Sequence, residues 1–169
     1  MVIKMVDQVE TTALQWLNER GVKLEDIAEL VHLLQKDYHE NLTLEMCLEN
    51  VKSVLKKREV QNAVLTGIEL DRLTEQGLIK EPLLDMLKRD EGLYGVDEII
   101  AFSVVNVYGS IGFTNYGYID KLKPGILKRL NDKSTGECHT FLDDIVGAIA
   151  AAASSRLAHS AGNEKFSDE

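Results

Sequence analysis

The sequence predicts an all-α protein, a helical bundle in which a central alanine-rich helix is surrounded by other helices. Apolar residues recur three and four positions apart along most of the chain, and this spacing puts them on one face of a helix. Only two prolines interrupt the pattern, and hydrophobic residues form 44% of the 169 positions, which is enough for one sizeable core. We therefore expect a single helical domain over residues 1–159 and a flexible polar tail over residues 160–169.

The first four helices are indicated by apolar stripes that end at recognisable stop signals. The first stripe ends at Gly21 and the fourth at Gly77, and glycine commonly follows the last turn of a helix. Thr43 stands where the third helix opens, and basic residues end that helix, where their charge suits the helix dipole. The four stripes cover 6–17, 24–38, 44–55 and 60–76.

The second half of the chain is expected to contain shorter helices and one long one. Pro82 suits the first position of a short helix. The glycines between Gly109 and Gly117 predict an irregular connection, and the alanines at 150–153 predict a thin helix that neighbours can approach closely. The expected helices are a short one from 82, one over 93–109, a short one over 126–130 and a last one from 140 to about 159.

Composition excludes several classes of protein. The chain carries 28 acidic and 19 basic residues, and a formal charge of −9 argues against general nucleic-acid binding. Cys47 and Cys138 lie far apart, so neither a disulfide framework nor a structural zinc cluster is expected. The charge-free stretch 99–119 contains too many polar residues and glycines for a membrane span, and no secretory signal is recognisable. We expect a cytoplasmic protein.

Three separate groups of acids adjoin segments that should be buried. Asp97 and Glu98 begin an uncharged helix, Asp120 follows the glycine-rich stretch, and Asp143 and Asp144 begin the alanine-rich helix. A carboxylate is costly to bury alone, and a bound cation would relieve that cost. Magnesium prefers such oxygen ligands. Acids at helix starts also serve as simple caps, so spacing alone leaves both interpretations open.

The stretch 120–133 is basic in an otherwise acidic chain, with five basic residues against two acidic ones. Lys121 and Lys123 lie next to Asp120. A positive patch beside an acidic site suits a phosphorylated or anionic-lipid ligand, because lysine neutralises phosphate charge. A solvated basic helix face explains the same pattern equally well.

The residues of the second half resemble those of the phosphatidylglycerophosphatase A family, in the branch that includes the low temperature requirement C proteins. The resemblance covers about 93–157. It rests on an Asp-Glu helix start at Asp97-Glu98 and on an Asp-x-x-Lys-Pro motif at 120–124. Asp132, Gly136 and the run Leu142-Asp143-Asp144-Ile145 complete it. Asp90-Glu91 is a second possible match for the acidic pair, but the apolar helix follows Asp97-Glu98 directly.

The resemblance implies a magnesium-dependent phosphatase that converts phosphatidylglycerophosphate to phosphatidylglycerol. The chain departs from the membrane enzymes of the family, which have several membrane spans and a Pro-Gly-Thr motif near the N-terminus. Water is the expected nucleophile, and attack by an aspartate is the alternative. The implied metal ligands are Asp97, Glu98, Asp120, Asp143 and Asp144, the catalytic residues are Asp120, Asp143 and Asp144, and the phosphate-binding residues are Lys123 and Lys121.

Two other functions fit the sequence. One is a phosphatase for a small water-soluble phosphomonoester, and the other is a non-catalytic helical adaptor that keeps the acids as caps or weak metal sites. The expected partners are a phospholipid headgroup or another phosphomonoester, with contact at the inner face of the membrane. Alanine-rich helix faces also lead us to expect a homo-oligomer.

Overall fold

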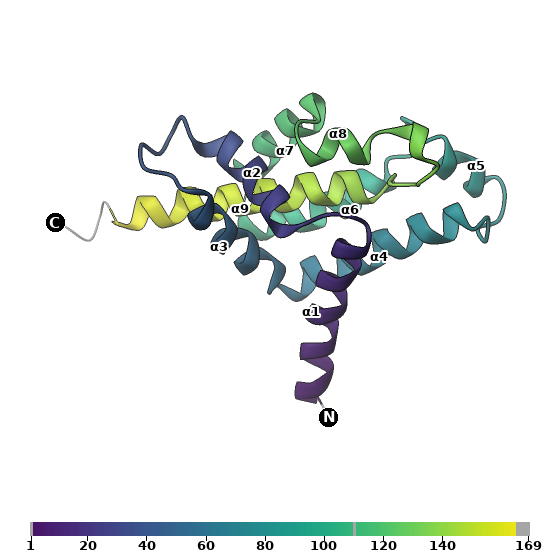
Figure 1. Cartoon of the computed structure of the whole chain (residues 1–169), viewed down its shortest axis with the longest axis horizontal. Helices are drawn as coiled ribbons and strands as arrows, with labels where there is room; N and C mark the ends of the chain where they lie inside the picture. The colour runs from purple at the N-terminus through teal and green to yellow at the C-terminus, as the bar shows by residue number, and fades with distance from the viewer. Residues whose placement is uncertain (1, 110, 165–169) are drawn as a thin grey trace.

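The computed structural model describes residues 2–109 and 111–164, and over these residues the chain is all-α (Figure 1). Nine α-helices and two short 3-10 helices occupy this described part, which contains no β-strand. The predicted fold class is confirmed. The helices are α1 (Val2–Glu19), α2 (Leu24–Gln35), α3 (Leu44–Leu55), α4 (Arg58–Glu75), α5 (Leu83–Lys88), α6 (Val96–Val105), α7 (Ile111–Leu122), α8 (Ile126–Leu130) and α9 (Leu142–Glu164), with η1 (Asn106–Tyr108) and η2 (Lys133–Thr135).

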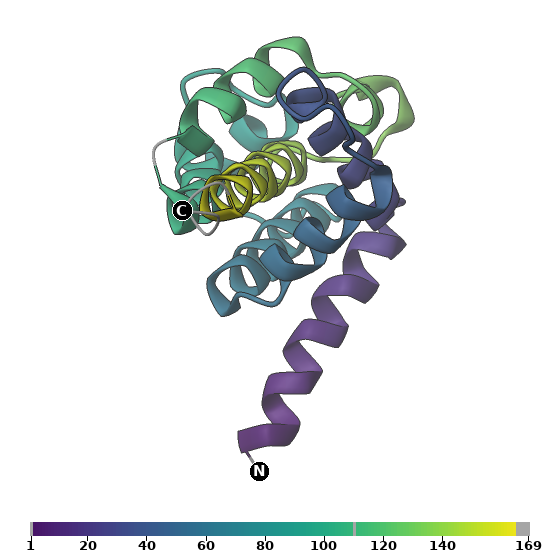
Figure 2. The same cartoon turned by 90° about the vertical axis from the view of Figure 1, so that its left-hand side faces the viewer.

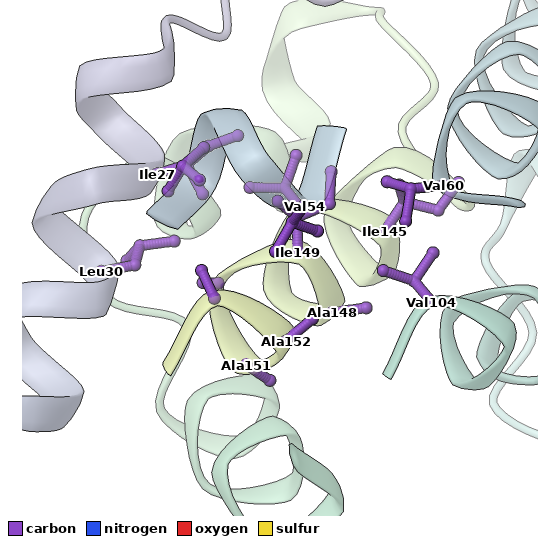
Figure 3. Close-up of a cluster of buried hydrophobic side chains, with 14 of the residues drawn as sticks. Ile27, Leu30, Val54, Val60, Val104, Ile145, Ala148, Ile149, Ala151 and Ala152 are labelled. Atoms are coloured by element: carbon purple, nitrogen blue, oxygen red, sulfur yellow. The ribbon is translucent and has the colours of Figure 1, made fainter. Parts of the chain in front are cut away.

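Helix α9 is the axis of the bundle. Figure 2 shows it nearly end-on, with the other helices gathered around it, and it contacts α2, α3, α4, α6, α7 and α8. The four alanines Ala150 to Ala153 are all 0% exposed, so their small side chains let every neighbour pack closely. Figure 3 shows the surrounding core, to which α2 contributes Ile27 and Leu30, α3 Val54, α4 Val60 and α6 Val104.

One connection was wrongly predicted as irregular. The chain is helical again from Ile111, and Gly112 and Gly117 both lie inside α7. A Cβ atom on Gly112 would lie 2.9 Å from Val105 Cγ1 and 3.1 Å from Ser155 Oγ. Gly112 therefore permits a close helix crossing, a role that its sequence context alone does not distinguish from a helix break. Only Gly109, with φ of 91°, adopts a conformation that suits glycine at the break itself.

The last helix is longer than predicted. It continues to Glu164, so residues 160–164 of the expected tail are helical. Residues 165–169 lie outside the described part of the chain.

Helix α1 projects from the bundle (Figure 2). It packs against α4, where the guanidinium of Arg72 lies 4.6 Å from the centre of the Trp16 ring and also pairs with Glu19. Among the helices of the described residues, none combines the length and the apolar character needed to cross a bilayer.

Candidate functional site

The ammonium group of Lys123 lies among three carboxylates at the start of α9. Its Nζ is 2.5 Å from Asp120 Oδ1, 2.7 Å from Asp143 Oδ2 and 3.6 Å from Asp144 Oδ1. Asp120 belongs to the last turns of α7, and Asp143 and Asp144 belong to the first turn of α9. The fold thus brings together four of the predicted site residues from segments 20 or more positions apart.

Of the predicted acidic pair Asp97-Glu98, the first side chain is buried at the site and the second is exposed to solvent. Asp97 is only 8% exposed and lies close enough to Asp144 for its charge to help raise the pKa of that carboxyl. Glu98 is exposed, and its side chain makes no hydrogen bond or ion pair with any residue that the structure describes. In the other possible pair, Glu91 binds Arg89 and Asp90 binds Lys133, although Asp90 still lies close enough to Asp143 for its charge to help raise the pKa of that carboxyl. Asp97 is therefore the acid of α6 that joins the cluster.

Burial dominates the electrostatics of the two acids on α9. Desolvation raises the pKa of Asp143 to about 6, although the nearby charge of Lys123 opposes this shift. Desolvation and the charge of Asp143 raise the pKa of Asp144 further, to about 10. One ammonium therefore does not fully compensate the negative charge of this cluster.

Lys123 remains a cation in these surroundings. Burial alone would lower its pKa, but the charges and hydrogen bonds of Asp143, Asp120 and Asp144 outweigh burial and raise it. Its backbone has a φ of 47°, in the left-handed region that non-glycine residues seldom adopt, and it directly follows the last residue of α7. Backbone strain of this kind persists where the surrounding contacts fix it, which here are the ion pairs of its side chain.

Tyr116 completes the cluster and was not predicted from the sequence. Its ring, on α7, lies 5.5 Å from that of Phe102, and the residue is 4% exposed. Burial, followed by the charges of Asp144, Asp120 and Asp143, raises the pKa of its hydroxyl. The hydroxyl lies beside the carboxyl of Asp144, which contributes to this shift, but no described residue is a hydrogen-bond partner to it in good geometry. A ligand or water molecule at the acids could supply one.

The basic stretch is mostly engaged within the chain. Arg129 donates hydrogen bonds to the carbonyl oxygens of Arg20 and Gly21, and Lys133 pairs with Asp90. Lys121 is exposed and has no ion pair with a described residue, so the structure does not bring it into the cluster around Lys123.

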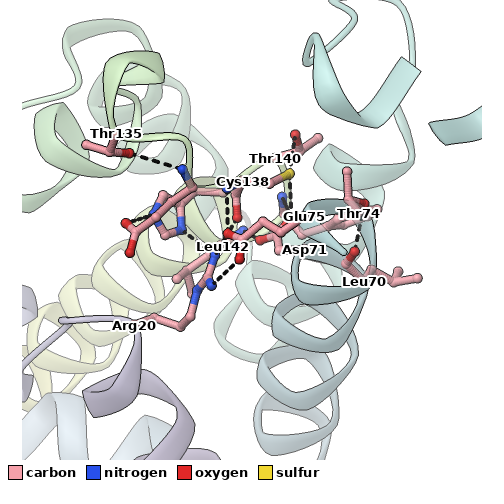
Figure 4. A network of polar contacts seen from close by, with 12 residues as sticks. Arg20, Leu70, Asp71, Thr74, Glu75, Thr135, Cys138, Thr140 and Leu142 are labelled. Atoms are coloured by element: carbon pink, nitrogen blue, oxygen red, sulfur yellow. Dashed lines mark hydrogen bonds and ion pairs between the residues drawn. The ribbon is translucent and has the colours of Figure 1, made fainter. Parts of the chain in front are cut away.

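A second polar network supports the segment that leads into α9 (Figure 4). Arg20 donates to Glu75 Oε1 and to the carbonyl oxygen of Cys138, each at 2.6 Å. Glu75 Oε1 also accepts the backbone N–H of Cys138 at 2.6 Å. Desolvation lowers the pKa of the buried His139 beside this arginine. The network ties α1 and α4 to the segment that leads into α9.

Asp71 is the residue of this network that bears on the site, and it was not among the site residues predicted from the sequence. Its Oδ1 accepts the N–H of Phe141 at 3.1 Å and its Oδ2 accepts that of Leu142 at 3.0 Å. Thr140 donates its hydroxyl to the carbonyl oxygen of Leu87, so Asp71 of α4, not a neighbouring residue of the chain, satisfies these first amides of α9. The available signal was an acid on the apolar stripe that contains Val64 and Ile68.

The side chains of the cluster are of the types that bind a hard divalent cation, but their positions do not form a metal site. The four carboxylates are oxygen donors of the kind that magnesium prefers. Among the side chains that the structure describes, those of 8–109 and 111–160, however, no three Asp, Glu, His or Cys residues stand in metal-binding geometry. The ammonium of Lys123 lies between the acids instead. The donors are thus of the type that magnesium prefers, while a lysine occupies the space between them.

A sequence model of the family described as phosphatidylglycerophosphatase A matches residues 14–159. This match begins far before residue 93, where the resemblance of the motifs began, and so includes Arg20, Asp71 and Glu75. The chain is also 72% identical over 154 residues to the uncharacterised protein YutG of Bacillus subtilis (strain 168), covering 91% of this chain and 93% of that protein.

Solved structures share the fold. The crystal structure of the low temperature requirement C protein from Listeria monocytogenes superposes with a TM-score of 0.90 at 65% identity, covering 91% of this chain and 97% of that one. A protein of unknown function from Bacillus stearothermophilus gives a TM-score of 0.89 at 72% identity, with 90% and 94% of the two chains covered.

Proposed function

The chain belongs to the phosphatidylglycerophosphatase A family, and from this membership we propose that it is a magnesium-dependent phosphatase acting on phosphatidylglycerophosphate. The observation that carries the proposal is the cluster of carboxylates from α7 and α9 around one lysine, with Asp97 of α6 beside Asp144. Such a cluster suits a site for a cation and a phosphate group. The product is phosphatidylglycerol.

We assign the metal ligands to Asp97, Asp120, Asp143 and Asp144. Bound magnesium would neutralise charge on the phosphoryl oxygens and make a water molecule more acidic. Glu98 was expected among the ligands, but its exposure and lack of contacts give no support for that role. Lys123 would neutralise the substrate phosphate.

The reaction is hydrolysis of a phosphomonoester. The oxygen of water forms a bond to phosphorus, while the bond between phosphorus and the glycerol oxygen breaks. Asp120, Asp143 and Asp144 supply the carboxylates that accept the proton of the attacking water, and a proton returns to the departing glycerol oxygen. The products are inorganic phosphate and an alcohol, so no further reactant is required.

We further propose that the enzyme meets its substrate at the inner face of the membrane. Large apolar side chains are exposed on the same helices that carry Asp97 and Asp120: Ile99 is 64% exposed, Tyr118 57% and Leu122 54%. Exposed apolar surface beside a site suits an interface with lipid. Lys121, exposed on α7, would contact anionic headgroups there.

We also propose a homo-oligomer, but the alanine-rich helix faces that led us to expect one give it little support. The alanine-rich face of α9 is buried within the chain, where it cannot also serve another subunit. Light scattering at micromolar concentration measures the oligomeric state, and a monomer would contradict the proposal.

Phosphate release from phosphatidylglycerophosphate tests the enzyme activity. We expect release with magnesium and none with excess chelator. If folded protein with magnesium releases no phosphate from any phosphomonoester, the helical adaptor becomes the better explanation. Competition by free glycerol phosphates separates the remaining alternative, because a phosphatase for small soluble substrates would prefer them to the lipid.

A further inference from the structure

The ammonium group of Lys123 has no free N–H donor with which to bind a phosphate, because three carboxylates surround it. An ammonium has three N–H donors, and Nζ has two short contacts, to Asp120 and Asp143, and a longer one to Asp144. Its side chain is 23% exposed and those of Asp143 and Asp144 are 6% and 8% exposed, so water screens these contacts weakly. As it stands, Lys123 is a structural cation.

The acids that hold Lys123 are also the acids proposed to hold magnesium. Asp143 Oδ1 accepts the backbone N–H of Asp144 at 2.8 Å, which leaves Oδ2 as its free oxygen, and that oxygen binds Nζ. Two cations cannot share these oxygens at contact distance without strong repulsion. The ammonium and a metal ion therefore compete for the same position.

Of the groups involved, Lys123 is the one that can move. Asp143 and Asp144 lie on a buried helix whose first amides are fixed by Asp71. Lys123 lies beyond the end of α7, and its charge is carried on a flexible four-carbon chain. Departure of the ammonium needs only rotations within that side chain.

We propose that Lys123 is the resident cation of the acidic cluster, that a divalent cation displaces it, and that the displaced ammonium then binds the substrate phosphate. This inference rests on the proposed function, because it concerns the same site. It makes phosphate binding conditional on metal binding: until the metal arrives, the lysine is sequestered by the acids. The metal and the substrate would then bind in a fixed order.

Amine acetylation followed by mass spectrometry tests the displacement in the unmodified sequence. Without metal, Lys123 should be acetylated slowly, since its nitrogen is held by carboxylates. Saturating magnesium should increase its labelling several-fold. Lys121, exposed and without an ion pair to a described residue, is the internal control and should not change. Magnesium binding that leaves the labelling of Lys123 unchanged, or reduces it, would overturn the proposal.

Equilibrium dialysis with manganese, as a stand-in for magnesium, tests the competition. Lys123→Met removes the competing charge and should tighten manganese binding on the order of tenfold. The same variant should release phosphate more slowly, because the phosphate loses its partner. Lys128→Met removes an exposed lysine of α8 that has no ion pair with a described residue; it is the matched control and should bind manganese as the original protein does. Weaker or unchanged binding by folded Lys123→Met would contradict the competition.

These measurements separate the inference from the function on which it rests. Metal-dependent labelling of Lys123 without phosphate release would sustain the exchange and reject the phosphatase. Phosphate release with Lys123 labelling unaffected by metal would sustain the phosphatase and reject the exchange. Absence of any metal binding would reject both.

Discussion

The carboxyl group of Asp71 accepts the backbone N–H of Leu142 at 3.0 Å, across 71 positions of sequence. Leu142 is the first residue of α9, and the two proposed metal ligands of that helix follow it directly. A residue from the first half of the chain therefore fixes the helix start on which the candidate site is built.

Replacement of Asp71 by asparagine should destabilise the protein by roughly 1–3 kcal/mol. An amide has one accepting oxygen, so one of the two buried N–H groups would lose its partner. Urea unfolding measures the change in the free energy of unfolding. Glu69→Gln is the matched control, since Glu69 is an exposed acid on the same helix. Equal stability of the two variants would show that the contact contributes nothing.

The same residue should make the stability depend on pH. Burial raises the pKa of Asp71 from its ordinary value of 3.8 to about 8, although two N–H donors and Arg20 favour its charged form. Above about pH 4 the unfolded chain has lost a proton that the folded protein keeps, so increasing pH favours unfolding. The free energy of unfolding of the metal-free protein should therefore fall between about pH 4 and about pH 8.

Urea titrations across this range test the sign. Asp71→Asn has no proton to lose at this position, so its stability should fall less steeply. The raised pKa values of Asp143 and Asp144 act in the same direction and should preserve part of the slope. A stability that increases with pH in the metal-free protein would contradict the assignment.

Asp97 and Glu98 should differ sharply in their effects on activity although they are neighbours. Asp97→Asn removes a buried carboxylate beside Asp144 and should lower phosphate release roughly 10- to 100-fold. Glu98→Gln should remain within about twofold, because surface changes away from contacts have little effect. Magnesium-dependent phosphate release measures both variants. A larger loss for Glu98→Gln would restore Glu98 to the ligand set.

Contact with lipid should depend on Ile99. Ile99→Asp places a charge in the exposed apolar surface of α6 and should weaken binding to phosphatidylglycerol vesicles roughly tenfold or more. Cosedimentation with vesicles measures this. Leu44→Asp is the control, because Leu44 is 50% exposed but lies at the start of α3. Equal losses in both variants would indicate nonspecific adsorption, and no loss in either would reject the proposed face.

Periodicity predicted most of the fold because a buried helix face depends on local spacing. The bounds of α2, α3 and α4 lie close to the predicted stripes. The break predicted between Gly109 and Gly117 failed because the requirement for Gly112 comes from Val105 and Ser155, which only the folded chain brings near.

The sequence predicted which acids come together better than how they are arranged. Acids beside segments expected to be buried pointed to Asp97, Asp120, Asp143 and Asp144, because buried charge is costly wherever it occurs, and the structure brings these four close together. No local sequence pattern predicts that the nitrogen of Lys123 lies between these acids, because its position depends on how the end of α7 packs against α9. Tyr116 was missed for the same reason.

The row of alanines along α9 also limits how a lipid can be handled. Methyl groups at Ala150 to Ala153 set the separation of the surrounding helices, and those positions are 0% exposed. Two fatty acyl chains could enter this interior only by forcing the helices apart and destroying their packing. A diacyl substrate would therefore keep its tails in the bilayer and present only its phosphorylated glycerol to the end of α9.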